Sequence, residues 1–167
     1  MSYVTFNLST LLSDKAPNLS LLALPASMVL AALPHWYTIV LAEVNKVQGG
    51  WSNVNPRSWV AQLNSKAASG KKLTALELKI LRGQSCQANA FENVPLFAAA
   101  IAVGNLAKLP NSSLNSFVLT YLLSRALFTY FYLSTETKAA SFLRTAVFQV
   151  GVLYIWYIFI KAGYKLQ

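Results

Sequence analysis

Residues 82–97 read RGQSCQANAFENVPLF, and they open an otherwise apolar run with an arginine, a glutamate, two glutamines and two asparagines. On a helix with about 100° per residue, several of these side chains share roughly a third of the circumference. They are Arg82, Ser85, Asn89, Glu92 and Asn93. A charge at membrane depth costs on the order of 2.5–3.5 kcal/mol, so such residues normally face a bundle interior or a hydrated cavity. The stretch predicts a membrane helix with one polar face, on which Glu92 needs a cationic or hydrogen-bonding partner.

The composition of the chain is that of a membrane protein. Of its 167 residues 55% are hydrophobic and only 11% are charged, whereas soluble domains carry about a quarter charged residues. The net charge of +9 comes from basic residues in loops between apolar runs. This distribution argues against nucleic acid and favours membrane lipids, with anionic headgroups, and small anionic ligands as partners. The single cysteine, Cys86, excludes an intrachain disulfide, offers no metal-binding spacing and is predicted to be a buried structural thiol.

Four apolar stretches are long enough to cross a bilayer as helices, which need about 20 residues each. They run approximately over residues 19–42, 75–108, 114–133 and 140–161. A long polar loop, residues 43–74, separates the first two, and the other connections are short, so consecutive helices should be antiparallel neighbours. Thr74 and Glu77 predict a capping box at the start of the second helix, which would then protrude beyond the bilayer by a turn or two. We therefore predict one domain over residues 1–167, an all-α integral membrane protein with four transmembrane helices in a bundle.

The distribution of basic residues predicts the topology. The long loop contains Lys46, Arg57, Lys66, Lys71 and Lys72, which by the positive-inside rule makes it cytoplasmic. Both termini of this multi-pass protein would then lie on the opposite side. Residues 1–18 lack the features of a removable signal peptide. The sequence does not distinguish between three locations, which are the endoplasmic reticulum, another internal membrane and a bacterial inner membrane.

The third apolar stretch offers a partner for Glu92. Tyr121, Arg125, Phe128 and Tyr132 recur at helical spacing and share one face. Arg125 is the only basic residue in that span, so we predict that it pairs with Glu92. The alternative is that the polar stripe only holds helices together.

Other signals of catalysis are weak. His35, the only histidine, has no second histidine or carboxylate nearby in the sequence, which favours a structural or interfacial role. The sequence contains no glycine-rich phosphate loop and no nucleophile elbow.

The residues Arg82, Asn89, Glu92, Pro95 and Phe97 resemble the signature of the membrane-associated proteins in eicosanoid and glutathione metabolism, the MAPEG family. Three further parts of the sequence resemble segments of its members. They are NPRSWVAQL ahead of these residues, Arg125 with Tyr132, and LRTAVF from Leu143. The similarity spans roughly residues 20–162 and is nearest to the microsomal glutathione transferases.

This resemblance implies a homotrimer that binds glutathione between neighbouring subunits, together with hydrophobic small molecules. When the family's binding positions are matched to this sequence one by one, the second-helix contacts with glutathione are Arg82, Gln87, Asn89 and Glu92. The third-helix contacts are Arg125 and Tyr132. Gln87 lies off the polar stripe, so the resemblance places it on the other subunit's side of the site.

The chemistry requires a thiolate, and a free thiol with a pKa near ~8.5 is only slightly ionised at neutral pH. The resemblance assigns activation of the thiol to Arg144, with a hydroxyl hydrogen bond from Thr145; a membrane-interface anchor is the other interpretation of Arg144. Ser85 and Phe128 depart from the family's eicosanoid-forming members, in which an arginine and a tyrosine or histidine occupy these positions. The departures argue against eicosanoid synthesis, and the serine removes one carboxylate partner for glutathione. The resemblance implies a glutathione transferase or peroxidase for detoxification, and the alternative is a non-catalytic lipid-binding or assembly protein.

Overall fold

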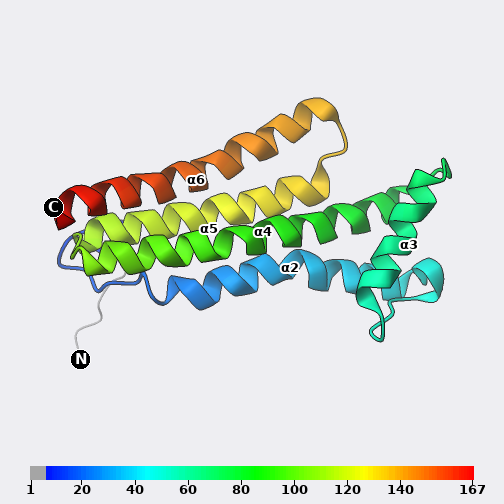
Figure 1. The fold of residues 1–167 in the computed structure, drawn as a ribbon, viewed down its shortest axis with the longest axis horizontal. Coiled ribbons are helices and arrows are strands. Elements are labelled where there is room, and N and C mark those ends of the chain that lie inside the picture. The colour runs from blue at the N-terminus through cyan, green and yellow to red at the C-terminus, as the bar shows by residue number, and fades with distance from the viewer. Residues whose placement is uncertain (1–6) are drawn as a thin grey trace.

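The computed structural model describes residues 7–167, and the regular structure of these residues is helical. The elements are α1 (Leu8–Leu11), α2 (Ala23–Val44), η1 (Val47–Gly49), α3 (Pro56–Ala68), α4 (Ala75–Leu106), α5 (Asn111–Ser134) and α6 (Lys138–Leu166). Figure 1 shows α2, α4, α5 and α6 running along the long axis of the molecule, with α3 crossing one end and the C-terminus at the other. Residues 1–6, the start of the segment predicted not to be a signal peptide, lie outside the described part.

The all-α prediction is confirmed, and the four long helices lie within a few residues of the predicted stretches. Three of them, α2, α5 and α6, are long and apolar enough to cross a membrane. The fourth, α4, is the longest at 32 residues and carries the polar stripe.

The interpretation of residues 43–74 as a loop was wrong in one respect, because the segment contains η1 and the 13-residue helix α3. Pro56 occupies the start of α3, where its missing N–H costs nothing. Trp59 and Leu63, one turn apart, are buried in a small apolar cluster with Ala42 of α2 and Ile80 of α4. This contact fixes α3 against the end of the bundle.

The predicted capping box at the start of α4 is confirmed. The backbone N–H of Glu77 donates to Thr74 Oγ1 (3.2 Å), and that of Thr74 donates to Glu77 Oε2 (2.8 Å). Lys66 of α3 donates to Glu77 Oε1 at 2.5 Å, so the same carboxylate also joins α3 to α4. The hydrogen bond from Lys66, and then that from the Thr74 backbone, lower the pKa of Glu77.

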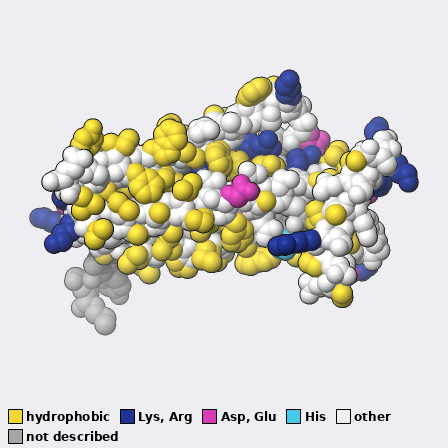
Figure 2. Space-filling model, viewed as in Figure 1, with side chains coloured by type: hydrophobic (Ala, Val, Ile, Leu, Met, Phe, Trp, Pro, Cys, Tyr) yellow, Lys and Arg dark blue, Asp and Glu magenta, His cyan; other side chains and the backbone are white. Residues whose placement is uncertain are grey.

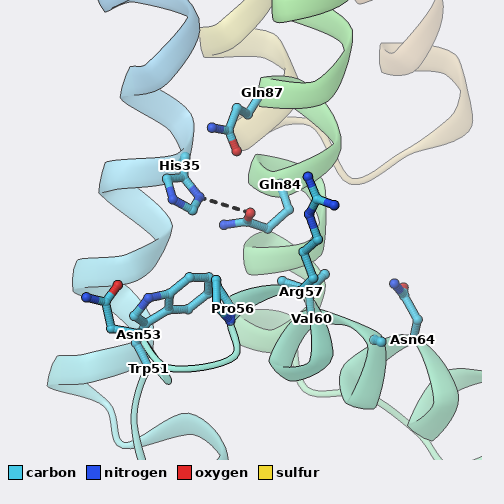
Figure 3. A pocket seen from close by; sticks show the side chains of 10 residues that line it. His35, Trp51, Asn53, Pro56, Arg57, Val60, Asn64, Gln84 and Gln87 are labelled. Atoms are coloured by element: carbon cyan, nitrogen blue, oxygen red, sulfur yellow. Dashed lines mark hydrogen bonds between the residues drawn. The ribbon is translucent and has the colours of Figure 1, made fainter.

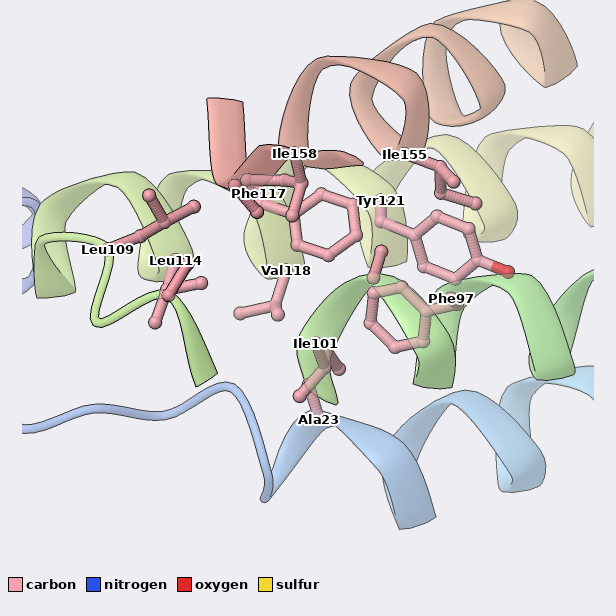
Figure 4. Packing of buried hydrophobic residues seen from close by; sticks show 13 residues of the cluster. Ala23, Phe97, Ile101, Leu109, Leu114, Phe117, Val118, Tyr121, Ile155 and Ile158 are labelled. Atoms are coloured by element: carbon pink, nitrogen blue, oxygen red, sulfur yellow. The ribbon is translucent and has the colours of Figure 1, made fainter. Parts of the chain in front are cut away.

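The main core lies where α4, α5 and α6 meet (Figure 4). Phe97 and Tyr121 stack with ring centroids 3.8 Å apart, and Phe117, Ile155 and Ile158 pack around them. On the other side of α4, Gly83 lies against Thr38 and the carbonyl of Pro34, where an added Cβ would clash. Helix α4 is therefore held between α2 on one side and α5 and α6 on the other.

Residues 8–20, here called the N-terminal strap, cross the end of the bundle opposite α3 (Figure 1). The buried side chain of Asn115 fastens them: its amide donates to the carbonyls of Leu11 and Pro17, and its oxygen accepts from the N–H of Leu19. Asn105 adds bonds to Asn18 and Ser20. Side chains of α4 and α5 thus supply hydrogen-bond partners for the backbone and side chains of the strap.

The outer surface is mostly apolar along the bundle, and lysines and arginines gather toward its two ends (Figure 2). Large exposed side chains such as Val29, Leu123, Leu153 and Trp156 lie on α2, α5 and α6. A surface of this kind matches hydrocarbon in the middle and headgroups at the ends.

Candidate functional site

The polar stripe of α4 faces partly outward. Arg82, at its beginning, is half-buried and donates through Nη2 to Glu136 Oε1 at 3.1 Å, in the connection between α5 and α6. Asn89 donates to the carbonyl of Ser85 within α4. Glu92 is exposed on the surface of the single chain. The stripe is therefore only partly covered by the helices of its own subunit.

The predicted pair between Glu92 and Arg125 is wrong within one chain. Arg125 is buried and turns toward α6, where its Nη2 donates to the carbonyl of Phe148 (3.1 Å). No ion pair joins Arg125 to a carboxylate in residues 7–167, and its Nε and Nη1 lack hydrogen-bond partners there. Helical spacing gave Arg125 the correct face of α5 for burial, but that face packs on α6.

Aromatic rings hold the guanidinium of Arg125. Its Cζ lies 4.3 Å from the ring centroid of Phe148 and 4.8 Å from that of Tyr121. Gly151 of α6 leaves the space, because a Cβ there would lie 2.5 Å from Arg125 Nη2 and 2.7 Å from Ser124 Oγ. Arg125 therefore makes cation–π contacts in the space left by Gly151, in place of the predicted ion pair with Glu92.

The structure brings Arg144 and Tyr132 together. Arg144, near the start of α6, lies with its Cζ 4.0 Å from the Tyr132 ring centroid, and Tyr132 contacts Phe128 edge to face at 5.2 Å. Thr145 beside Arg144 is exposed and donates to the carbonyl of Ser141 at 3.3 Å. The end of α5 and the start of α6 thus form a basic and aromatic cluster on the same side of α4 as Arg82.

Gln87 lies elsewhere. It lines a cavity of about 530 Å³ between α2, α3 and α4, here called the α3 cavity (Figure 3). Other lining residues are His35 of α2, Trp51, Arg57 of α3 and Gln84 of α4. Arg57 is the charged member of this lining, and its side chain is exposed.

A chain of hydrogen bonds crosses the wall of the α3 cavity. His35 Nδ1 lies 3.0 Å from Gln84 Oε1 (Figure 3), and Gln84 Nε2 in turn donates to Thr38 Oγ1 at 2.7 Å. Gln84 was not among the residues predicted to form a site, and His35 was predicted to have a structural or interfacial role. No sequence signal joined the two, because their contact depends on the packing of α2 against α4, 49 positions away along the chain.

The predicted residues therefore occupy two faces of α4. Arg82, Tyr132 and Arg144 lie on the side of α5 and α6, whereas Gln87 lies in the α3 cavity on the side of α2. The helix itself stands between the two groups, so one ligand cannot contact both on a single chain.

Comparison with known proteins supports the resemblance noted in the sequence. Residues 21–164 match the model of the MAPEG family. No curated protein and no solved structure matches the chain. The matched range contains the polar stripe of α4, the basic and aromatic cluster and the residues of the α3 cavity. Because it covers nearly the whole sequence, the chain belongs to the MAPEG family and is a membrane protein.

Proposed function

We propose that this protein is an integral membrane glutathione transferase or peroxidase, a homotrimer of four-span subunits with its site between neighbours. The observation that carries the proposal is the division of the predicted residues between two faces of α4, with Glu92 exposed. In a ring of subunits, the stripe of one chain can face the α3 cavity of the next. That arrangement covers Glu92, which would otherwise lie at membrane depth at a cost of about 3 kcal/mol.

The charges in these two regions complement glutathione. The tripeptide carries two carboxylates, an ammonium group and a thiol. Arg82 retains a buried Nε–H without a partner in the described chain, and Arg57 is exposed, so each can take a carboxylate. Glu92 suits the ammonium group, while Asn89, Gln87 and Tyr132 offer further polar contacts.

Arg144 would favour the thiolate form of the bound tripeptide. A cation close to a thiol lowers the pKa of that thiol, most strongly where water is excluded. The stacking of Arg144 on Tyr132 holds the guanidinium within the basic and aromatic cluster. Thr145 is the next residue of α6, and its hydroxyl would have to turn from the carbonyl of Ser141 to reach the sulfur. The thiolate then attacks an electrophilic carbon, and a leaving group such as chloride departs with its electron pair as the carbon–sulfur bond forms. With a peroxide acceptor it attacks the terminal oxygen, so the O–O bond breaks and an alcohol is released, and a second glutathione converts the resulting sulfenic acid to the disulfide and water.

The acceptor is a hydrophobic small molecule that arrives from the bilayer. The apolar outer faces of α2, α5 and α6 lead laterally to the polar region. In this proposal α4 is the fourth span and α3 lies on the cytoplasmic surface, as the basic residues of the long connection indicate.

Glutathione binding and conjugation of a chlorinated nitroaromatic by the purified protein test the proposal. Removing Arg144 (Arg144→Ala) should leave binding measurable but lower the rate, by about tenfold for each unit by which the pKa of the thiol rises. Glu92→Gln should weaken binding by about tenfold, through loss of a charge-assisted hydrogen bond. Arg144→Lys should keep part of the rate, and Lys165→Gln, at the opposite end of the bundle, is the matched control.

A second function is favoured by Ser85 and Phe128, which replace polar contacts of the eicosanoid-forming members. It is a non-catalytic lipid-binding or assembly role, with the stripe kept for subunit contacts. Absence of both binding and turnover in the native protein would exclude the enzyme and leave this second role.

A further inference from the structure

A pocket lined by hydroxyl groups lies between α5 and α6, at the end of the bundle opposite α3. It has a volume of about 170 Å³ and is here called the hydroxyl pocket; its lining residues are Ser112, Ser113, Ser116, Tyr154 and Tyr157. The serines belong to the first two turns of α5 and the tyrosines to α6. These residues take no part in the polar stripe of α4 or in the α3 cavity, so the hydroxyl pocket is a separate feature of the molecule.

Lys161 of α6 brings a positive charge to this pocket. Its Nζ donates to Ser113 Oγ at 2.7 Å and to the hydroxyl of Tyr157 at 3.2 Å. An ammonium group has three N–H bonds, so these two neutral acceptors leave one of them over. The lysine is half-buried and forms no ion pair with a carboxylate within residues 7–167. Its charge therefore lacks an anionic partner in the described chain.

The hydroxyl groups beside Lys161 are donors that lack an acceptor. Because Ser113 and Tyr157 accept from the ammonium, their own hydrogens stay free to donate. Ser116 and Tyr154 make no side-chain hydrogen bond in the described part of the chain. Four hydroxyl hydrogens and one N–H thus line the pocket, and this set matches a group that only accepts hydrogen bonds and carries negative charge.

The surrounding charges decide where an anion can bind. Asp14 of the N-terminal strap accepts from the backbone N–H and the hydroxyl of Ser112, so that edge of the pocket already has a carboxylate. Lys165, one turn beyond Lys161, donates to the carbonyl of Lys108 and adds positive charge at the same end of the bundle. An anion is therefore expected beside Lys161 and away from Ser112.

The position of the pocket favours a lipid over a soluble anion. Ser113 lies in the first turn of α5 and Lys161 in the last two turns of α6, which is the depth of the headgroups for helices that cross a bilayer. Leu153 and Ile160, four and three positions from Tyr157 on α6, are 56% and 59% exposed. They offer an apolar surface next to the pocket for acyl chains, which a free phosphate does not use.

We infer that the hydroxyl pocket binds the phosphate of an anionic phospholipid in the leaflet opposite α3. Lys161 is the counter-ion, and the free hydroxyls donate to the phosphate oxygens that carry the charge. A choline or ethanolamine headgroup brings a further positive charge to an end rich in lysine, so lipids with a net negative charge bind more tightly. This site is independent of glutathione and of the site between subunits.

The first test measures lipid binding to the delipidated protein in detergent by native mass spectrometry. Phosphatidylglycerol should bind at least about tenfold more tightly than phosphatidylcholine with the same acyl chains. Lys161→Gln should weaken phosphatidylglycerol binding by about tenfold or more, through loss of a charge-assisted hydrogen bond. Lys165→Gln removes an equal charge from an exposed position and is the matched control, for which the affinity should change by less than about twofold.

The second test keeps every charge in place. Ser116→Ala combined with Tyr154→Phe removes two free donors, so the affinity for phosphatidylglycerol should fall by about tenfold. Ser134→Ala with Tyr130→Phe, two exposed positions at the other end of α5, is the matched control. Thermal unfolding of each variant verifies that it is folded.

The last comparison distinguishes a lipid from a free anion. Neither inorganic phosphate nor glycerol 3-phosphate at millimolar concentration should displace phosphatidylglycerol; displacement by either would overturn the assignment to a lipid. Equal affinity of the native protein for the two lipids would overturn the inference, as would unchanged phosphatidylglycerol binding in the folded Lys161→Gln variant or in the folded double variant.

Discussion

Arg125 illustrates how a buried charge is accommodated without a counter-ion. Its guanidinium lies among Tyr121, Phe128 and Phe148 and makes one hydrogen bond, to the carbonyl of Phe148. Burying a charge costs several kcal/mol, and the cation–π contacts and one hydrogen bond return a similar amount. We conclude that Arg125 contributes little net stability to the isolated subunit.

Because the cost of burying the charge and the energy of its contacts nearly cancel, we can predict the effect of Arg125→Met. The change removes one hydrogen bond and the cation–π contacts but also removes a buried charge, so the free energy of unfolding should stay within about 1 kcal/mol of the native value. Thermal unfolding in a single detergent measures it. A loss of more than about 3 kcal/mol would show that Arg125 has a carboxylate partner in the assembled protein.

Gly151 gives the complementary prediction. An alanine there would bring its Cβ within 2.5 Å of Arg125 Nη2 and 2.7 Å of Ser124 Oγ, so Gly151→Ala should destabilise the protein by about 1–3 kcal/mol. Combining it with Arg125→Met should restore part of the loss, because one of the two clashes disappears. Strict additivity of the two changes would contradict the observed contact.

At the scale of the element, α3 depends on a single carboxylate as well as on its apolar face. Glu77 accepts from Lys66 of α3 and from the backbone of Thr74. The Glu77→Gln change should therefore loosen α3 and lower stability by about 1 kcal/mol, a modest value because Lys66 is partly exposed to solvent. Faster hydrogen exchange in α3 would report the change. The control is Lys71→Gln, which removes one exposed charge of the opposite sign.

The contribution of Glu77 depends on pH with a defined sign. Its pKa in the folded protein is lowered from the ordinary value of 4.5, so the stabilisation is complete above that value. It is lost as the pH falls through the lowered pKa, where the carboxylate takes up a proton. The difference in stability between the native protein and Glu77→Gln should vanish in that acidic range; a difference that persists there would exclude the charged contact as its cause.

The long helices could be predicted from the sequence because each apolar run exceeds the thickness of a bilayer. Helix α3 was missed, although Pro56 at its start and Trp59 and Leu63 one turn apart were visible. Glycine and lysine around that short amphipathic segment suggested a loop. The partner of Arg125 could not be predicted, since helical spacing gives the face of a residue but not the neighbour of that face.

At the scale of the whole molecule, the site proposed here needs two chains. Co-expression of two inactive variants tests this requirement directly. One carries Arg144→Ala in the basic and aromatic cluster, and the other carries Arg57→Gln with Gln87→Leu in the α3 cavity. In mixed trimers one site in three would combine an intact cluster with an intact cavity, so activity should partly return.

The control is a mixture of the two variants purified separately, which should stay inactive while the assemblies do not exchange chains. Native mass measurement in detergent should give three times the 18.3 kDa of one chain. A stable monomer, or no recovery of activity in verified mixed trimers, would contradict a site shared between subunits.

The fastening of the N-terminal strap by Asn115 has a practical consequence for anyone preparing the protein. A chain trimmed to begin at Leu21 would leave a buried carboxamide with none of its three backbone bonds, a loss of several kcal/mol at the end of the bundle opposite α3. Affinity tags and fluorescent fusions are accordingly better joined to the carboxyl end, where Gln167 is exposed, than substituted for the opening residues.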